Sequence, residues 1–265
     1  MIFCPLISGS SGNATLVSHG RTTVLVDAGR SGVQIEDLIR IAGLEPKQLS
    51  MIVVTHEHAD HVQGVGVLSR RYRIPVHATE GTWAALDRRK AVGRLSPEMR
   101  RVLTPGKPLD AGDLLIMPFE IPHDAAQPVG YRFLAGTQTA AVVATDLGEP
   151  TTIVESACVG VSVALVESNH DIAMLRDGPY PKELQERILS RYGHLCNETA
   201  GWLVALMLRH GARRLYLGHL SQENNHPAVA LETVRRILRE SGIDPTRHGN
   251  VCVADRHRCS EPMEL

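Results

Sequence analysis

The stretch "MIVVTHEHADH", residues 51–61, decides the fold, because an apolar run leads directly into four potential metal ligands. The run "MIVVT" predicts a short buried strand. Where a strand ends, residues i and i+2 point the same way, so His56 and His58 can share one metal ion. Asp60 and His61 begin the next predicted element and turn toward a second ion. Imidazole and carboxylate groups suit zinc, iron or manganese better than a magnesium site made of oxygens alone.

Three further residues occupy strand ends and supply the partners that this run needs. His123 follows "FEIP", Asp146 follows "AAVVAT" and His219 follows "RRLYLG". A single histidine in such a place is usually structural or on the surface. Together with the four residues above they make seven ligands, which are enough for two metal ions bridged by one carboxylate.

The composition excludes several other classes of protein. The chain has 265 residues, of which 43% are hydrophobic and 22% charged, as in ordinary soluble domains. No apolar run reaches the roughly 18 residues that cross a bilayer, so we expect no membrane partner. The first residues show no signal peptide. The five cysteines are scattered and none is spaced as C-x-x-C, which favours reduced thiols in the cytoplasm. The oligomeric state is left open.

The order of predicted elements favours an α/β protein. Strands are expected near residues 2–7, 14–18 and 22–27, three more between 113 and 145, and others within "IPVHA", "VSVALVE" and "RLYLGH"; helices are expected at 33–42, 62–72, from Thr82, and near 181–192, 197–210 and 227–240. Each half passes from antiparallel strands to strand and helix alternation. Two mixed sheets packed face to face with helices outside, a four-layer αββα sandwich, account for this order. No linker is evident, so we expect one domain over residues 1–265.

Two segments have undecided roles. The loop "ISGSSGN", residues 7–13, lacks the lysine of a phosphate-binding P-loop and runs into a strand, so it is not a nucleotide loop. Either Ser10, Ser11 and Asn13 contact the substrate or the loop is only a turn. The basic stretch from Arg88 to Arg101 is either a solvated face or a surface for a phosphate backbone.

These motifs together resemble the metallo-β-lactamase fold superfamily. Asp27, in "VLVDAG", resembles its first motif, residues 56–61 its second, and the three strand-end residues its third to fifth. The resemblance implies two divalent metal ions, Zn²⁺ with Mn²⁺ or Fe as alternatives. It assigns His56, His58 and His123 to one ion, Asp60, His61 and His219 to the other, and Asp146 to the bridge. Asp27 would orient a ligand or the loop behind it.

A second pair of residues points to phosphodiester chemistry within this superfamily. Glu167 closes the strand "VALVE", and His194 follows in "RYGHLCNETA". The arrangement is similar to the glutamate and histidine of ribonuclease Z. It implies that His194 contacts the phosphate and protonates the leaving oxygen while Glu167 holds that proton, and Asp60 joins them as a predicted catalytic residue. The alternative is that Glu167 caps a turn and His194 starts a helix.

Other sequence segments resemble the YycJ/WalJ branch of the superfamily, which is regarded as a group of 5′-to-3′ DNA exonucleases. The matching phrases include "SGSSGNATLV", "ESNHD" and "GHLSQENN", and the last places Asn225 as a weak substrate contact. Cys196 departs from the more usual serine, and the role of His170 is open. The resemblance implies DNA ends as partner. A hydrolase of small esters, thioesters, lactones or cyclic phosphodiesters, and a non-catalytic binding protein, remain alternatives.

Overall fold

A computed structural model describes residues 1–137, 139–244 and 250–265, which group into two compact units. Unit 1 comprises Met1–Glu120, Ala125–Thr139 and Asp255–Leu265, and unit 2 comprises Ile121–Asp124 and Ala140–Ala254. The described strands belong to two mixed sheets accompanied by helices, which confirms the predicted α/β class. The single domain over residues 1–265 stays a prediction. Among the described residues, no helix combines the length and the apolar character that crossing a membrane requires.

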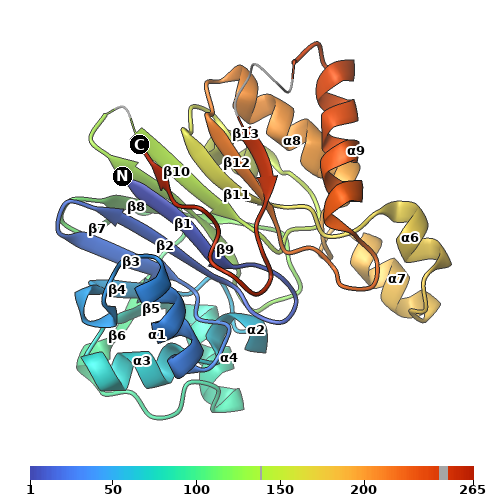
Figure 1. The fold of residues 1–265 in the computed structure, drawn as a ribbon. Helices are drawn as coiled ribbons and strands as arrows, with labels where there is room; N and C mark the ends of the chain where they lie inside the picture. The colour runs from blue at the N-terminus through green and yellow to red at the C-terminus, as the bar shows by residue number, and fades with distance from the viewer. Residues whose placement is uncertain (138, 245–249) are drawn as a thin grey trace. The chain divides into compact units, whose positions relative to one another are not determined.

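The main sheet of unit 1 has the order β14-β1-β2-β3-β4-β5-β6 (Figure 1). The first strands pair antiparallel and those from β3 to β6 pair parallel. Branched and apolar residues that are buried on both faces favour this arrangement, as all of β3 illustrates. The bounds are β1 Ile2–Ile7, β2 Ala14–His19, β3 Thr22–Val26, β4 Met51–Val53, β5 Val76–Thr79, β6 Arg100–Leu103 and β14 Met263–Glu264.

The helices of unit 1 connect the parallel strands, and Figure 1 shows α1, α3 and α4 together along β4 to β6. They are α1 Gly32–Ile41, α2 Ala59–Val62, α3 Val65–Tyr72 and α4 Glu80–Arg89, with short 3₁₀ turns η1 Pro46–Gln48 and η2 Pro97–Met99. The helix predicted over 62–72 is present as α3, but it begins at Val65, and Val62 belongs to the separate short helix α2. The backbone N–H of Gly64 donates to the carbonyl of Ala28 at 2.8 Å, and this tertiary bond separates α2 from α3.

Unit 1 also contains an antiparallel group, β7 Leu109–Asp110, β8 Leu115–Glu120 and β9 Val129–Ala135. The buried Tyr131 of β9 donates its hydroxyl to the carbonyl of Val54 at 2.6 Å, and Val129 N–H donates to the carbonyl of Thr55. Both bonds fix the backbone immediately after β4. The residues that follow Thr55 therefore leave the sheet from a rigid point.

Unit 2 contains four parallel strands, β10 to β13, in the order β13-β12-β11-β10. Their cores, such as "VALVE" in β11, are continuous apolar runs, as expected of parallel strands covered by helices. Figure 1 shows α8 and α9 side by side, with α6 and α7 apart from them. The bounds are β10 Thr139–Ala144, α5 Thr152–Cys158, β11 Val163–Glu167, α6 Ile172–Asp177, α7 Lys182–Leu189, α8 Asn197–Arg209, β12 Arg214–Gly218, α9 Pro227–Glu240 and β13 Asn250–Val253.

The buried His77 of β5 makes the stability of the fold depend on pH. Burial and the neighbouring Arg101 lower the pKa of His77 to about 4, against about 6.5 in an unfolded chain. The unfolded state therefore takes up the proton first, and the stabilisation present above pH ~6.5 is lost as the pH falls toward ~4. Between pH ~7.5 and pH ~5 we expect His77 to account for a loss of about 2 kcal/mol in the free energy of unfolding.

Urea unfolding of the wild type and of His77→Gln at both pH values measures this contribution. The variant should lose about 2 kcal/mol less than the wild type between the two conditions. Its absolute stability does not enter the comparison. An equal loss in both proteins would contradict the assignment to His77.

Candidate metal centre

The sequence "HEHADH", residues His56–His61, forms the turn that follows β4. We name these six residues the β4 motif. His56 follows the rigid exit of β4, and His58 is the N-cap residue of the short helix α2. His56 is fully buried, and its Nε2 lies 3.0 Å from Nδ1 of His58. His61, in α2, is also fully buried. The local chain path therefore gathers imidazole nitrogens in a small volume, as the i and i+2 spacing predicts for His56 and His58.

Asp27 organises the β4 motif from the end of β3. It has a left-handed backbone conformation with φ of 59°, which is uncommon for a residue other than glycine. Its carboxylate accepts hydrogen bonds from Thr55 N–H and Thr55 Oγ1, both at 2.8 Å, and from Nδ1 of His61 at 2.7 Å. Burial raises the pKa of Asp27, and the charge and hydrogen bond of His61 oppose this rise. The bond fixes the proton of His61 on Nδ1 and leaves Nε2 as the ligand atom.

The loop of residues 9–13 is tied to the same motif through Asn13. The Asn13 backbone N–H donates to the carbonyl of Asp60 at 2.8 Å, and its amide nitrogen lies 3.1 Å from Nε2 of His61. Gly29 permits this approach, since a Cβ there would lie 1.7 Å from the carbonyl oxygen of Asp60. Ser10 is exposed and Ser11 is half-buried. Of the three predicted substrate contacts in this loop, only Asn13 touches the β4 motif.

Two predicted ligands of unit 2 occupy strained positions just beyond strands. Asp146 follows β10 with φ of 60°, and His219 follows β12 with φ of 53°. Left-handed conformations of such residues cost on the order of 1–3 kcal/mol and concentrate at functional sites. Nε2 of His219 lies 3.3 Å from Oδ1 of Asp146. The strand ends therefore bring a nitrogen and an oxygen ligand together, as the sequence predicts.

Glu167 is the centre of this group, which we name the Glu167 cluster: Asp146, Glu167, His194 and His219. Its Oε1 accepts from Nδ1 of His194 at 2.7 Å and from Nδ1 of His219 at 2.9 Å. Its Oε2 accepts from the backbone N–H groups of Leu147 and Leu195. The sequence analysis pairs Glu167 with His194 and does not predict its bond to His219. One carboxylate thus orients two imidazoles.

Glu167 and His194 each shift the pKa of the other. Burial alone would raise the pKa of Glu167, but the charge and N–H of His194, with the N–H of His219, lower it well below its usual range. Burial alone would lower the pKa of His194, but the Glu167 carboxylate raises it above its ordinary value. The pair therefore favours a protonated His194 beside an ionised Glu167, relative to the same groups in isolation. This is the protonation state that a general acid needs.

His194 does not open a helix, which corrects the sequence interpretation. Helix α8 begins at Asn197, with Cys196 as its N-cap residue, so His194 lies in the preceding turn. Its side chain is 22% exposed, in contrast to Glu167, which has no exposed surface. His123 lies nearby in unit 2, with ring centroids 5.2 Å apart, and its Nδ1 donates to the carbonyl of Gly193 at 3.2 Å. The position of His194 leaves it accessible to a substrate.

The donor set fits divalent metal ions. The ligand atoms of the Glu167 cluster lie within 4.8 Å of one another. His61, His123 and His219 each have Nδ1 hydrogen-bonded to a carboxylate or a backbone carbonyl. This pattern leaves Nε2 available and is typical of metal-binding histidines. Nitrogen and carboxylate ligands of this kind suit zinc, iron or manganese.

A buried amide network supports the Glu167 cluster, and the sequence analysis misses most of it. Asn225 donates to the carbonyls of Ser168 and Asn169, and Asn197 donates to the Asn225 side-chain oxygen. Asn169 in turn donates to the carbonyl of His219 at 2.9 Å. These bonds engage the amide of Asn225 inside the protein and support a positioning role. The only sequence signal was the abundance of asparagine in "ESNHD" and "SQENNH".

His170 and Cys196 lie beside the same cluster. Burial lowers the pKa of His170 to about 4, so it is neutral near pH 7. The backbones of His170 and Cys196 form an isolated parallel β-bridge. The thiol of Cys196 lies 3.2 Å from Oγ1 of Thr199 and makes no side-chain cap to α8. The N-terminus of α8 therefore lacks the side-chain oxygen that serine provides.

Because the N-cap position of α8 has no side-chain acceptor, we predict that Cys196→Ser stabilises the protein. A serine oxygen at the N-cap accepts a backbone N–H of the first helical turn, which contributes about 1 kcal/mol. We expect the free energy of unfolding to rise by up to that amount, as measured by urea unfolding. Cys196→Ala is the matched control, since it removes the thiol without adding an acceptor. A stabilisation of equal size in Cys196→Ala would contradict the capping explanation.

Comparisons with known proteins agree with the motifs. The family model described as the beta-lactamase superfamily domain matches residues 22–220. The chain is 38% identical over 241 residues to "Exodeoxyribonuclease YycJ" of Bacillus anthracis, covering 91% of this chain and 90% of that protein. It is 37% identical to "Exodeoxyribonuclease WalJ" of Streptococcus pneumoniae, covering 90% and 88%.

A solved structure shows the same fold. The metallo-beta-lactamase fold protein YhfI of Bacillus subtilis matches with a TM-score of 0.73 and 15% identity, covering 98% of both chains. The fold and the resemblance drawn from the motifs are thereby confirmed.

Proposed function

Because this chain belongs to the beta-lactamase superfamily domain family, we propose that it is a metal-dependent phosphodiesterase that degrades DNA from an end, in the 5′-to-3′ direction. Membership of this hydrolase superfamily makes it an enzyme. The names of the relatives, exodeoxyribonuclease YycJ and WalJ, support DNA as the substrate. The five free cysteines support a location in the cytoplasm.

The observation that carries the proposal is the shared oxygen of Glu167, which accepts from both His194 and His219. It joins a partly exposed histidine, whose protonated form it favours, to a candidate metal ligand through one buried carboxylate. A phosphodiester needs both functions, because the leaving oxygen must receive a proton while the phosphate charge is neutralised. Hydrolysis of a thioester has less need of such an acid, because a thiolate is a better leaving group than the alkoxide of a phosphodiester.

We propose the following ligands for two divalent ions, Zn²⁺ in the first place and Mn²⁺ or Fe as alternatives. Unit 1 offers His56, His58, Asp60 and His61, and unit 2 offers His123, Asp146 and His219. When bound, the ions would lower the pKa of a coordinated water to about 7 and neutralise phosphate oxygens.

The protein's own groups supply the remaining steps. His194, charged beside Glu167, donates its proton to the departing oxygen, and Glu167 holds the imidazole in place through Nδ1. Asp27 and Glu167 fix the protons of His61 and His219 on Nδ1. The positioned histidines therefore need no reorganisation when the substrate arrives.

Metal analysis coupled to digestion of end-labelled polymers tests the proposal. The purified protein is assayed with 5′- and 3′-labelled single- and double-stranded DNA and RNA, with Zn²⁺, Mn²⁺ or Fe²⁺ added. Release of mononucleotides first from the 5′ end of DNA is the expected result. Polymers that stay intact with every metal while a thioester is cleaved would overturn it in favour of a small-ester hydrolase.

A further inference from the structure

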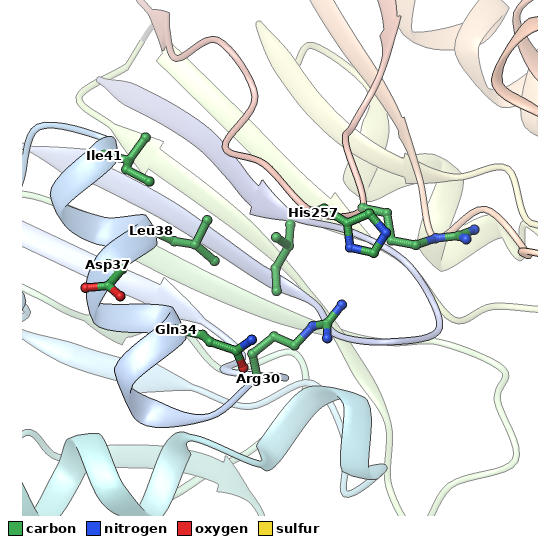
Figure 2. A pocket seen from close by; sticks show the side chains of 8 residues that line it. Arg30, Gln34, Asp37, Leu38, Ile41 and His257 are labelled. Atoms are coloured by element: carbon green, nitrogen blue, oxygen red, sulfur yellow. The ribbon is translucent and has the colours of Figure 1, made fainter.

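A cavity of about 350 Å³ lies in unit 1 between α1 and the C-terminal segment Asp255–Leu265 (Figure 2). We name it the Arg30 pocket after the residue that enters it from the turn after β3. Figure 2 shows Gln34, Asp37, Leu38 and Ile41 along α1 on one side and His257 opposite Arg30. Arg256 belongs to the same lining. The volume lies within the usual range of small-molecule sites, roughly 300–1,000 Å³.

Arg30 is held in the pocket by the loop of residues 9–13. Its Nη2 donates to Oγ of Ser11 at 2.8 Å. A Cβ at Gly12 would lie 2.8 Å from both Cγ and Nε of Arg30, so only glycine lets the arginine lie flat on the loop. The guanidinium therefore has a fixed position and does not lose much conformational freedom when it binds an anion.

Arg256 lies against the other part of the same loop, where a Cβ at Gly9 would be 3.1 Å from its Nε. The segment that carries Arg256 is anchored on both sides. Ser8 N–H donates to the carbonyl of Asp255 at 3.0 Å, and the thiols of Cys4 and Cys259 lie 3.0 Å apart. Two arginines from opposite ends of the chain therefore flank one glycine-containing loop.

The lining of the pocket contains more basic than acidic residues. It includes Arg30 and Arg256 against one carboxylate, Asp37, which also pairs with Arg40 at 3.0 Å. Asp255 accepts the backbone N–H groups of His257 and Arg258 at 2.7 and 3.1 Å. The formal charge of the lining therefore favours an anion. Arginine forks match the oxygens of a phosphate, and the adjacent serine hydroxyls add further donors.

The loop also connects this pocket to the β4 motif. Asn13, at its end, accepts the backbone N–H of Gly9 with its side-chain oxygen and holds Asp60 and His61 as described above. A phosphate bound at Gly9 and Gly12 would thus lie one short loop away from two proposed ligands of unit 1.

We propose that the Arg30 pocket binds a phosphate group of the DNA strand, through the guanidinium groups of Arg30 and Arg256. This inference rests on the proposed function for its substrate class. The phosphate is either the terminal 5′-phosphate or an internal one, and both have the same recognition chemistry. The site adds to the role of the loop, in which Ser11 accepts a hydrogen bond from Arg30.

Binding of single-stranded DNA by the metal-loaded protein tests the proposal. The probe is a fluorescent phosphorothioate oligonucleotide, which resists cleavage, with either a 5′-phosphate or a 5′-hydroxyl, and anisotropy gives its Kd at several salt concentrations. Arg30→Gln and Arg256→Gln should each weaken binding about tenfold, as expected for the loss of a hydrogen-bonded charge. Each should also reduce the slope of log K against log salt by about 0.7.

Matched variants separate the pocket from a general loss of charge. Arg258→Gln removes the same charge from an exposed residue of the same segment and should leave Kd within about twofold, as for an isolated surface charge. Arg30→Lys keeps the charge and should retain more affinity than Arg30→Gln. A loss confined to the 5′-phosphorylated probe assigns the terminal phosphate, and an equal loss with both probes assigns an internal phosphate.

Unchanged Kd and salt slope in both glutamine variants would overturn the pocket, as would an equal loss in Arg258→Gln or no binding by the wild type. A melting temperature equal to that of the wild type establishes that the fold of each variant is intact. Cleavage of natural DNA by the wild type is measured in parallel. Cleavage without any effect of the variants on binding rejects the pocket alone, whereas binding effects without cleavage reject the proposed function.

Discussion

Asp146→Ala is expected to lose bound metal and activity together. The Asp146 carboxylate is buried, lies 3.3 Å from Nε2 of His219, and is held by a strained backbone at the end of β10. No other carboxylate of the Glu167 cluster can replace it, because Glu167 is committed to two histidines. We expect metal content, measured by plasma mass spectrometry, to fall by one ion or more per chain, and DNA cleavage to fall by about 10⁴-fold or more.

Asp177→Ala is a suitable control, because Asp177 is an exposed residue of unit 2 at the end of α6. It should retain the metal content and the cleavage rate of the wild type. An Asp146→Ala protein that keeps its metal and its rate would remove Asp146 from the proposed ligands.

His194→Ala is expected to separate chemistry from metal binding. His194 donates to Glu167, is partly exposed, and stacks on the ring of His219, a proposed metal ligand, with ring centroids 5.2 Å apart. Its removal should leave the metal content unchanged and lower kcat by roughly 10²-fold, the usual contribution of a general acid. A substrate with a good leaving group, such as a p-nitrophenyl phosphodiester, should lose less, because its departing oxygen needs no proton. Equal losses on both substrates would contradict the acid role.

The pH dependence gives an independent measurement of the same pair. The charge of Glu167 keeps the proton on His194 to a higher pH than that of an ordinary histidine. Activity that needs this proton therefore persists through the ordinary value of about 6.5 and declines above it. Glu167→Gln removes the charge, so the basic limb of kcat should move to lower pH. The shift is read from protein whose metal content has been measured. A basic limb at the same pH in both proteins would exclude this coupling.

Some boundaries could be predicted from the sequence because local signals and tertiary structure agree. Helix α9 has the predicted bounds, with Pro227 in its first turn, an N-cap bond from Ala228 to His226, and Gly242 beyond its end at φ of 72°. Helix α3 begins at Val65 instead of the predicted residue 62, and the tertiary bond between Gly64 and Ala28 at this break leaves no trace in periodicity. Strand β6 was not predicted, because Arg100 and Arg101 were interpreted as part of a basic surface stretch.

In that strand, the structure gives Arg100 a local role. Its guanidinium lies 4.3 Å from the ring centroid of Trp83 and pairs with Asp87 at 2.8 Å. Part of the basic stretch from Arg88 to Arg101 is therefore committed to packing β6 against α4. The sequence could not distinguish this use of a charge from contact with a phosphate backbone.

The candidate ligands were visible in the sequence because His56, His123, Asp146 and His219 each follow a strand, and the rest of the β4 motif continues from His56. Their supporting bonds were not, because those bonds join residues that are distant in sequence. Glu167 and His219 are 52 residues apart, and Asn13 and His61 are 48 apart. Distances of this kind depend on the sheet order, which a hydrophobic pattern does not specify.

The shared oxygen of Glu167 has a consequence for how this enzyme can change. Any substitution that alters the basicity of that oxygen acts on His194 and His219 at once, so the proposed acid strength of His194 and the proposed metal affinity of His219 would change together. Double-mutant cycles across the three residues should be strongly non-additive. Adaptation to a different metal or a poorer leaving group would therefore require coordinated substitutions, and single steps along that route would pass through weaker catalysts.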